Sequence, residues 1–333
     1  MAEARFLVVR LGSLGDIVHT FPAVAGLRET FPDGQITWLT HPRWELLVRS
    51  SGLASEIWAT ETRSLGSTRE IVRRIRAGRF AAAIDYQGLW KSAGLPLAAG
   101  VKRRIGFSWE TIREFGVPIL YTDRVRCRTT HIADQNGELS LRAGARRGTA
   151  DFELSVPEDA EKLVEAYLRS NALERYVVLS PGGGWRSKCW PAERFGTLCQ
   201  KICGALGLRC VVNYGPGEDD LAQGVRAAAG GARPLLYHGE LGELMALLKN
   251  SCCVVGGDTG PLHLGIAVGT PAVGLFGPTD PARNGPYRTQ DIVLRAAGAV
   301  RDHSRRQETD PAMLAIGVEE VFEAVRRRVG AAH

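Results

Sequence analysis

A carboxylate follows the first apolar run of the chain, where it can act as a base. The loop of residues 12–16, GSLGD, comes directly after a strand-like run at residues 5–11 and ends in Asp16. Its glycines leave backbone N–H groups open to a diphosphate, and a carboxylate within hydrogen-bond reach of a hydroxyl can remove its proton. Alternatively, Asp16 only caps a helix beginning at Ile17, which contributes about 1 kcal/mol. The residues alone leave both interpretations open.

The same loop argues against a nicotinamide cofactor. A dinucleotide-binding loop has the pattern G-x-G-x-x-G, with an acidic residue about 20 positions further on. The loop of residues 12–16 has two glycines with a different spacing. We therefore do not expect dehydrogenase chemistry here.

A lysine in a glycine-rich loop can stabilise a phosphate leaving group. The loop SPGGGWRSKCWP at residues 180–191 follows another apolar run and carries Lys188. Its glycines expose backbone donors, and a fixed cation stabilises the negative charge that develops on a departing diphosphate. The alternative is an ordinary surface lysine. A position inside a glycine-rich loop at a strand end makes that alternative the weaker one.

A third segment, residues 256–281, has the residue pattern of a strand that ends at a ligand-binding turn. Gly256 and Gly257 follow the apolar run of residues 252–255, where they would let a ligand approach the strand end without a Cβ in the way. Asp258 and Thr259 precede a short helix that carries His263. A helix N-terminus presents free N–H groups and a positive dipole, which suit an anion or sugar hydroxyls. A capping aspartate and a buried polar histidine would give the same pattern.

Length and composition indicate a globular protein of about two domains. Of its 333 residues, 44% are apolar and 23% are charged. The sequence shows no signal-peptide pattern and no run of about 18 apolar residues. The cysteines number seven and form no CxxC pair. We therefore expect reduced thiols in a cytoplasmic protein, without disulfides or zinc.

The excess of basic residues favours an acidic partner. The formal net charge is +6, and arginine and lysine gather at residues 69–79, 102–104, 124–128 and 142–147. These clusters are not interleaved with aromatic residues, and no nucleic-acid-binding module is visible. An anionic membrane glycolipid fits the charge equally well, although most individual arginines are expected on solvated helix faces.

Strand and helix patterns alternate along the chain, which predicts doubly wound parallel sheets of the α/β class. The pattern is interrupted at the polar residues 149–158, so we place domains at residues 1–157 and 158–333. Predicted strands are residues 5–11, 35–40, 56–59, 80–85, 104–107, 176–180, 209–214, 234–238, 252–255 and 271–276. Predicted helices include residues 17–30, 67–77, 159–170, 192–206, 219–229, 241–250 and 317–329.

Several motifs, taken in order, resemble family nine glycosyltransferases, the ADP-heptose transferases of lipopolysaccharide core synthesis. RFLVVRLGSLGDIVHTFP at residues 5–22 is similar to the family's opening strand and GD-x-x-H-T-x-P turn. DYQGLWKSA, SWETIRE and HIADQN in the first half resemble the heptosyltransferase I branch. In the second half, KCWP matches its K-x-W-P, and residues 256–281 match its donor-site segment. The likeness extends over nearly the full chain.

The resemblance implies a GT-B fold, in which two Rossmann-like domains face a central cleft. The first domain would bind the acceptor and the second the ADP-sugar, with the last helix packing back on the first domain. The implied reaction moves L-glycero-D-manno-heptose from ADP-heptose to Kdo with inversion, with Asp16 as general base and Lys188 stabilising the ADP leaving group. The implied donor-binding residues are Ser13, Leu14, Gly15, Gly183, Gly184, Glu218, Gly239, Asp258, Thr259, Gly260 and His263. The implied acceptor-binding residues are Lys91, Arg113, His131 and Gln135.

Other expectations complete this hypothesis. No DxD motif or His/Cys cluster requires a metal, so Mg²⁺ would be non-essential. We expect a monomer that meets a Kdo-lipid A type acceptor at the inner membrane surface. The alternatives are a relative using another ADP-sugar or acceptor, such as heptosyltransferase II, and an epimerase or inactive binding protein of the same fold. The charged segment of residues 299–310 has no assigned role.

Overall fold

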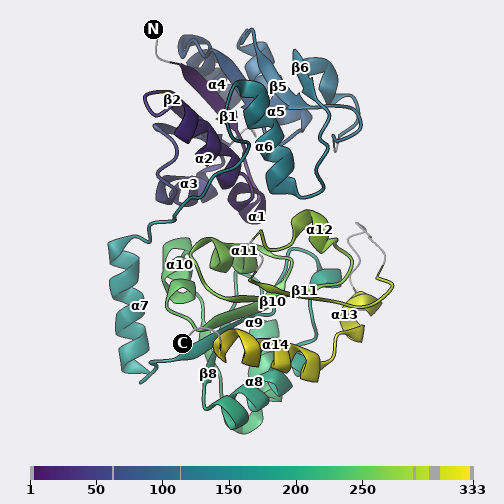
Figure 1. The fold of residues 1–333 in the computed structure, drawn as a ribbon. Coiled ribbons are helices and arrows are strands. Elements are labelled where there is room, and N and C mark those ends of the chain that lie inside the picture. The colour runs from purple at the N-terminus through teal and green to yellow at the C-terminus, as the bar shows by residue number, and fades with distance from the viewer. Residues whose placement is uncertain (1–3, 62–63, 113, 288–289, 300–307, 331–333) are drawn as a thin grey trace. The chain divides into compact units, whose positions relative to one another are not determined.

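The chain folds into two compact α/β units in a computed structural model (Figure 1). The structure describes residues 4–61, 64–112, 114–287, 290–299 and 308–330. The two units comprise residues 1–155 and 156–333. Each contains a six-stranded sheet in which neighbouring strands pair in parallel. Arg113 and most of the segment 299–310 lie outside the described residues.

The sheet of the first unit has the strand order β3-β2-β1-β4-β5-β6. Its strands are β1 (Arg5–Val9), β2 (Gln35–Thr40), β3 (Glu56–Ala59), β4 (Ala82–Asp85), β5 (Arg104–Phe107) and β6 (Asp123–Val125). Its helices are α1 (Leu14–Val18), α2 (Phe21–Thr30), α3 (Glu45–Ser50), α4 (Leu65–Ala77), α5 (Trp90–Ala98) and α6 (Ile132–Ala143), with 3₁₀ turns η1 (Pro42–Trp44) and η2 (Val117–Leu120).

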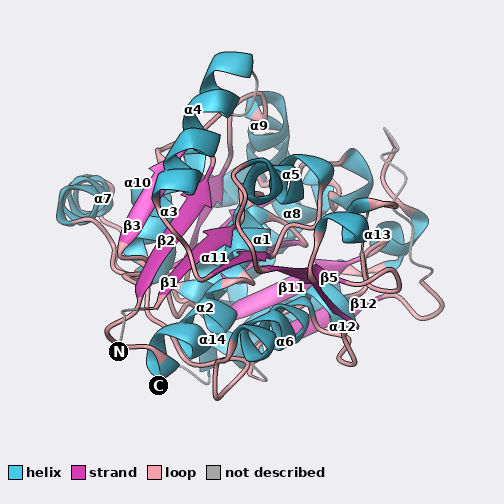
Figure 2. Ribbon diagram, turned by 90° about the horizontal axis from the view of Figure 1, so that it is seen from above, coloured by secondary structure: helices cyan, strands magenta, loops and turns pink. Residues whose placement is uncertain are grey.

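Alternate residues of β1 serve two helix layers, because successive side chains of a strand point to opposite faces. Leu7 and Val9 belong to a buried cluster with Ile71 of α4 and Leu95 of α5. Phe6 points the other way, and its ring lies 5.0 Å from that of Phe31, at the end of α2. Figure 2 shows β1 and β2 between α4 and α2. A strand buried on both faces explains the continuous apolar run in the sequence.

The second unit repeats this plan with the order β12-β11-β10-β7-β8-β9. Its strands are β7 (Tyr176–Ser180), β8 (Arg209–Asn213), β9 (Leu235–Tyr237), β10 (Cys253–Gly257), β11 (Ala272–Phe276) and β12 (Ile292–Arg295). Its helices are α7 (Glu158–Ser170), α8 (Ala192–Leu206), α9 (Asp219–Ala228), α10 (Leu241–Lys249), α11 (Gly260–Ala267), α12 (Pro281–Asn284), α13 (Pro311–Ala315) and α14 (Val318–Gly330), with turns η3 (Arg186–Lys188) and η4 (Gly230–Ala232). The last helix, α14, packs on α8 and on β10, β11 and β12 of its own unit.

The doubly wound parallel sheets are confirmed, with differences in detail. The predicted helix at residues 17–30 is two helices, α1 and α2, with His19 and Thr20 between them. Pro22 lies in the first turn of α2, where its missing N–H costs nothing. Strands β6 and β12 were not predicted, because they are short edge strands whose residues are only partly buried. Within the described part of the chain, every helix is too short or too polar to span a lipid bilayer.

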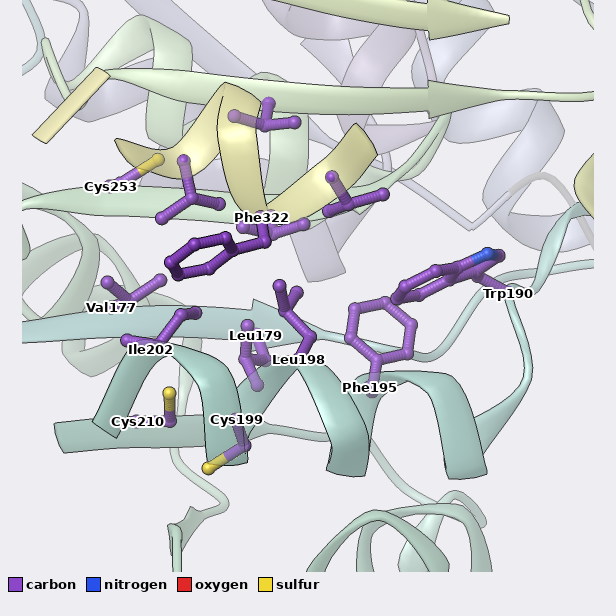
Figure 3. Close-up of a cluster of buried hydrophobic side chains, with 14 of the residues drawn as sticks. Val177, Leu179, Trp190, Phe195, Leu198, Cys199, Ile202, Cys210, Cys253 and Phe322 are labelled. Carbon is purple, nitrogen blue, oxygen red and sulfur yellow. The ribbon is translucent and has the colours of Figure 1, made fainter. Parts of the chain in front are cut away.

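Trp190 anchors the core of the second unit (Figure 3). Its ring meets that of Phe195 edge-on, with the centroids 5.0 Å apart. Its indole N–H donates to the carbonyl of Ile316, at 3.0 Å, so the polar atom of this fully buried side chain is satisfied. The tryptophan of the KCWP motif therefore pins the end of the glycine-rich loop, two residues after Lys188.

We expect Trp190→Ala to destabilise the second unit by about 3–5 kcal/mol, because the substitution opens a cavity and leaves the Ile316 carbonyl without its donor. Denaturant unfolding, followed by far-UV circular dichroism, measures the loss. Leu163→Ala, at a side chain of the same unit that is 59% exposed, should change stability by less than about 0.5 kcal/mol. Equal stability of the two variants would contradict this account of the core.

Candidate active site

Asp16, Lys188 and Asp258 follow the strands between which the direction of strand connection reverses. In the first unit, β1 and β4 are neighbours, and the loops that follow them carry residues 10–16 and 86–89. In the second unit, β7 and β10 are neighbours, followed by residues 181–191 and 258–259. Ligands of open α/β sheets bind outside the carboxyl ends of strands at such a switch point. Each unit therefore presents a candidate ligand-binding region of its own.

Asp16 lies in the first turn of α1 and does not cap a helix beginning at Ile17. The helix begins at Leu14, and Ser13 is its N-cap residue. Oδ2 of Asp16 accepts hydrogen bonds from the Ser13 backbone N–H, at 3.1 Å, and from the Ser13 hydroxyl, at 2.9 Å. Oδ1 lies 2.6 Å from Nη2 of Arg10. These contacts fix the orientation of a carboxylate whose side chain is still 40% exposed.

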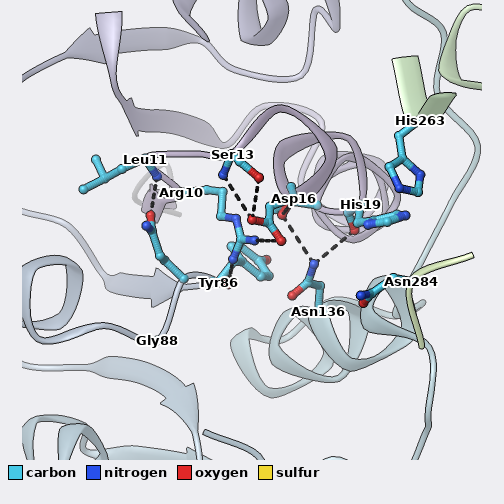
Figure 4. Close-up of polar contacts among 12 residues, drawn as sticks. Arg10, Leu11, Ser13, Asp16, His19, Tyr86, Gly88, Asn136, His263 and Asn284 are labelled. Atoms are coloured by element: carbon cyan, nitrogen blue, oxygen red, sulfur yellow. Dashed lines mark hydrogen bonds and ion pairs between the residues drawn. The ribbon is translucent and has the colours of Figure 1, made fainter. Parts of the chain in front are cut away.

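Arg10 is a site residue that sequence reasoning missed. Its buried guanidinium lies between Asp16 and the loop after β4, where Nη1 donates to the carbonyl of Tyr86 (Figure 4). In the same region, the backbone N–H of Leu11 donates to the side-chain oxygen of Gln87, at 2.6 Å. The available signal was an arginine at the end of an otherwise apolar strand, since a cation there requires a partner.

The surroundings of Asp16 keep its carboxylate ionised. Burial raises the pKa of this carboxyl, but the Arg10 guanidinium, the two Ser13 donors and His19 act in the opposite direction and leave the pKa below its usual value. A carboxylate oxygen can accept more than one hydrogen bond. Oδ2 takes both Ser13 donors and Oδ1 takes the Arg10 guanidinium, so Oδ1 retains more capacity for a further hydrogen bond.

A buried aspartate shapes the loop after β4. The carboxylate of Asp85 accepts from the backbone N–H groups of Gln87 and Gly88, at 2.9 and 3.2 Å. It also accepts from the hydroxyls of Ser92 and Tyr121, at 2.8 and 2.7 Å. Burial raises the pKa of Asp85, and all four donors oppose that rise. The aspartate of the DYQG motif therefore holds the loop that supplies the Tyr86 carbonyl to Arg10.

The predicted acceptor residues have different surroundings. The ring of His131 meets that of His19 at right angles, with the centroids 5.5 Å apart, which places it near the Asp16 loop. The amide of Gln135 donates to the carbonyls of Thr129 and Thr130, so it braces its own loop. Lys91 lies exposed in the first turn of α5. Arg113 lies outside the described residues.

A buried charge cluster occupies the switch point of the second unit. Nζ of Lys188 lies 2.9 Å from Oδ2 of Asp258, and Nε2 of His263 lies 2.9 Å from Oδ1 of the same carboxylate. Burial raises the pKa of Asp258, but His263 and Lys188 outweigh it, so the pKa falls well below the usual range. Three residues assigned to separate donor contacts are therefore joined in one hydrogen-bonded unit.

The glycines of the second unit let loops from different strands approach one another. A Cβ at Gly182 would lie 2.2 Å from the carboxylate oxygens of Glu218, and one at Gly183 would lie 3.1 Å from Cγ2 of Thr259. A Cβ at Gly257 would lie 2.7 Å from the carbonyl of Lys188, so this glycine clears space for protein backbone, where we had expected a ligand. Gly184 faces open space.

The other predicted donor residues of the second unit follow β8, β9 and β10. Glu218 accepts a hydrogen bond from the Gly215 N–H, at 2.8 Å. Gly239 follows β9, where a Cβ would meet Tyr237 and Glu243 at 2.7 Å. Thr259 precedes α11, which begins at Gly260. Among the described residues, the buried Thr259 hydroxyl has no hydrogen-bond partner, which fits a polar ligand at this helix N-terminus.

We expect Arg10→Met to raise the pKa of the Asp16 carboxyl, because the variant removes the neighbouring cation and keeps the burial. A ¹³C NMR titration of side-chain carboxyl groups measures the change, and Asp16→Asn identifies the signal. Arg49→Met, which breaks the exposed Arg49–Glu45 pair of α3, should leave the Asp16 titration unaltered. A folded Arg10→Met protein with the wild-type titration would contradict the assigned role.

Sequence comparisons find relatives among the lipopolysaccharide heptosyltransferases. The model of glycosyltransferase family 9 (heptosyltransferase) matches residues 68–313. Lipopolysaccharide heptosyltransferase 1 of Escherichia coli O18:K1:H7 (strain RS218 / NMEC) is 29% identical over 310 residues, which cover 88% of this chain and 92% of that protein. Lipopolysaccharide heptosyltransferase 3 of Escherichia coli K12 is 26% identical over 312 residues, 89% of each chain.

Solved structures show the same fold. A family 9 glycosyltransferase from Veillonella parvula has a TM-score of 0.84 at 22% identity, covering 98% of this chain and 97% of that one. Escherichia coli heptosyltransferase WaaC with ADP has a TM-score of 0.78 at 23% identity, covering 97% and 99%. These likenesses confirm two Rossmann-like sheets of the GT-B type. Because the family model spans well over half of the sequence, this chain is a member of glycosyltransferase family 9.

Proposed function

We propose that this protein transfers L-glycero-D-manno-heptose from ADP-heptose to a Kdo residue of the lipopolysaccharide inner core, with inversion. The observation that carries the proposal is the Asp16 carboxylate, held by Arg10 and Ser13 at the switch point of the first unit. The names of the relatives, lipopolysaccharide heptosyltransferases 1 and 3, support the donor and the type of acceptor.

Asp16 would act as the general base on the acceptor hydroxyl. Oδ1 accepts the hydrogen bond of that hydroxyl, and the proton moves to it as the oxygen attacks the anomeric carbon. A carboxylate of lowered pKa does not remove the proton beforehand, because a free hydroxyl is far less acidic. It becomes an effective base only as the attack acidifies the hydroxyl.

Lys188 would stabilise the ADP leaving group from the second unit. Its ammonium has three N–H donors, and two of them meet the carboxylate and the backbone carbonyl of Asp258, at 2.9 and 3.4 Å. The third can meet the diphosphate, together with the backbone N–H groups at the start of α11 and the Thr259 hydroxyl. In this proposal Glu218 binds the ribose hydroxyls, and Gly239 lies beside the adenine.

The experiments below distinguish the proposed function from two others. The similar identities to heptosyltransferases 1 and 3 leave open an acceptor other than Kdo. A UDP-GlcNAc 2-epimerase from Methanocaldococcus jannaschii also shares the fold, with a TM-score of 0.56 at 13% identity. Such an epimerase would prefer UDP to ADP.

We expect Asp16→Asn to lower transfer from ADP-heptose to Kdo-lipid A by about 10²–10⁴-fold, because the amide cannot take up the proton. The initial rate of ADP release measures the loss. Asp33→Asn, at an exposed aspartate of the same unit, should retain wild-type activity. Undiminished transfer by Asp16→Asn would overturn the mechanism. If the wild type transferred heptose only to a different acceptor, the proposed acceptor would be wrong.

We expect calorimetry to show tighter binding of ADP than of UDP, and about 10- to 100-fold weaker ADP binding by Lys188→Met. The variant loses one charge-assisted contact to the diphosphate. Lys201→Met removes a cation of the same unit that pairs with Glu319, and it should bind ADP as the wild type does. A preference for UDP would favour the epimerase instead. Unchanged ADP affinity in Lys188→Met would remove the lysine from the donor site.

A further inference from the structure

Helix α5 exposes an apolar face. Trp90 is 50% exposed, and Leu97, seven residues on, is also exposed. Gly94, four residues after Trp90, has open space where a side chain would stand. Residues spaced by three and four lie on one side of a helix. A surface helix normally directs such a row toward the core, so this face requires another explanation.

The exposed apolar area continues over the neighbouring turn η2 and the loop before it. Phe115 is 88% exposed and Ile119 is 64% exposed. The rings of Trp109 and Phe115 lie 5.7 Å apart, and the ring of Trp90 lies 2.7 Å from the position of a Cβ on Gly116. We call these side chains the α5–η2 surface: Trp90, Leu97, Trp109, Phe115 and Ile119.

A buried cluster joins the two elements beneath this surface. Ala93 of α5 packs against Val117 and Tyr121, at the two ends of η2. The hydroxyl of Tyr121 is held by Asp85, at 2.7 Å. Several large apolar side chains are thus presented outward from a backbone that is fixed from within. Single exposed apolar residues are ordinary on protein surfaces, whereas a contiguous group marks an interaction site.

Cations border the α5–η2 surface on more than one side. Arg76 of α4 donates to the carbonyl of Ala98 at the end of α5, at 2.9 Å. Arg104 and Arg124 donate to the carbonyls of Leu120 and Pro118 in η2, at 2.7 and 2.8 Å. Lys91, next to Trp90, is exposed. These arginines bond neutral carbonyls and so retain their positive charge, while the carboxylate of Glu114, which accepts from the backbone N–H of Trp90 at 2.8 Å, is an anion beside the same surface.

We propose that the α5–η2 surface docks on an anionic phospholipid bilayer. Tryptophan and other amphipathic side chains favour the headgroup region, and each nearby cation adds about 1 kcal/mol of attraction to anionic lipids. A second copy fits poorly, because two faces with the same cationic border would repel each other. The inference goes beyond the proposed transfer reaction and uses none of its catalytic residues.

Vesicle flotation tests the proposal on the full chain. We expect binding to vesicles of phosphatidylglycerol and phosphatidylethanolamine, and about tenfold weaker binding to phosphatidylcholine vesicles. High salt should weaken the anionic case, because it shortens the screening length from about 10 Å at 0.1 M to about 3 Å at 1 M. Brominated lipids should quench tryptophan emission on binding, and the quenching should fall in Trp90→Phe/Trp109→Phe.

The double variant Phe115→Ser/Ile119→Ser should lose at least about tenfold in affinity for anionic vesicles, because two apolar side chains no longer enter the interface. Leu163→Ser, in α7, is the matched control, since its side chain is 59% exposed and lies in the other unit. Thermal unfolding and ADP calorimetry check that both variants are folded. Transfer to a lipid-free Kdo acceptor should be retained by the double variant, which separates this test from that of the proposed function.

Three results would overturn the proposal. One is the absence of vesicle binding by the wild type, and another is equal binding by the wild type and the double variant. The third is a dimer in analytical ultracentrifugation that dissociates in the double variant, since this would make the α5–η2 surface a self-association face. Loss of transfer without loss of vesicle binding concerns the proposed reaction and not this surface.

Discussion

The first unit depends on the need to neutralise one buried guanidinium. Arg10 follows β1, and its charge is removed from water by the surrounding sheet and loops. Removing a single partner from a buried ion pair costs several kcal/mol, because the remaining charge stays uncompensated. Arg10 therefore holds both of its partners, the carboxylate of Asp16 and the carbonyl of Tyr86. This one requirement ties α1 and the loop after β4 to the end of β1, and it fixes the proposed base.

The second unit contains a buried anion that must be neutralised, whereas the first contains a buried cation. Its buried group is the carboxylate of Asp258, which is compensated by Lys188 and His263. Here too the charged groups follow adjacent strands, since Lys188 lies in the loop after β7, and Asp258 and His263 follow β10, with His263 in α11. A parallel doubly wound sheet brings such loops together at its switch point, where buried backbone N–H groups are also available. The fold thus supplies the position, and the charge requirement selects the side chains.

The sequence predicted the elements better than it predicted the contacts between them. The apolar run of β7 identifies this strand with its observed bounds, because a strand buried on both faces reads as a continuous hydrophobic segment. Motifs identified Asp16 and Lys188, but not the partners of either. Lys188 and Asp258 are 70 positions apart, so their pairing depends on the order of strands in the sheet and not on any local spacing. The role of Gly257 was misassigned for the same reason, since the backbone that it admits belongs to a distant loop.

The pairing of Lys188 has a consequence for how it can act. A lysine on a flexible stem is a mobile charge, and fixing it costs side-chain entropy of up to about 2 kcal/mol. In this protein that entropy is lost when the chain folds, because Asp258 holds the ammonium from one side and the ring of Trp185 lies 4.5 Å from it. In the proposed reaction, a cation already fixed before the donor binds would require little reorganisation as negative charge develops on the diphosphate, and such preorganised charges stabilise transition states most effectively. Asp258 lowers the net charge of the site, but in return it keeps the cation in one place.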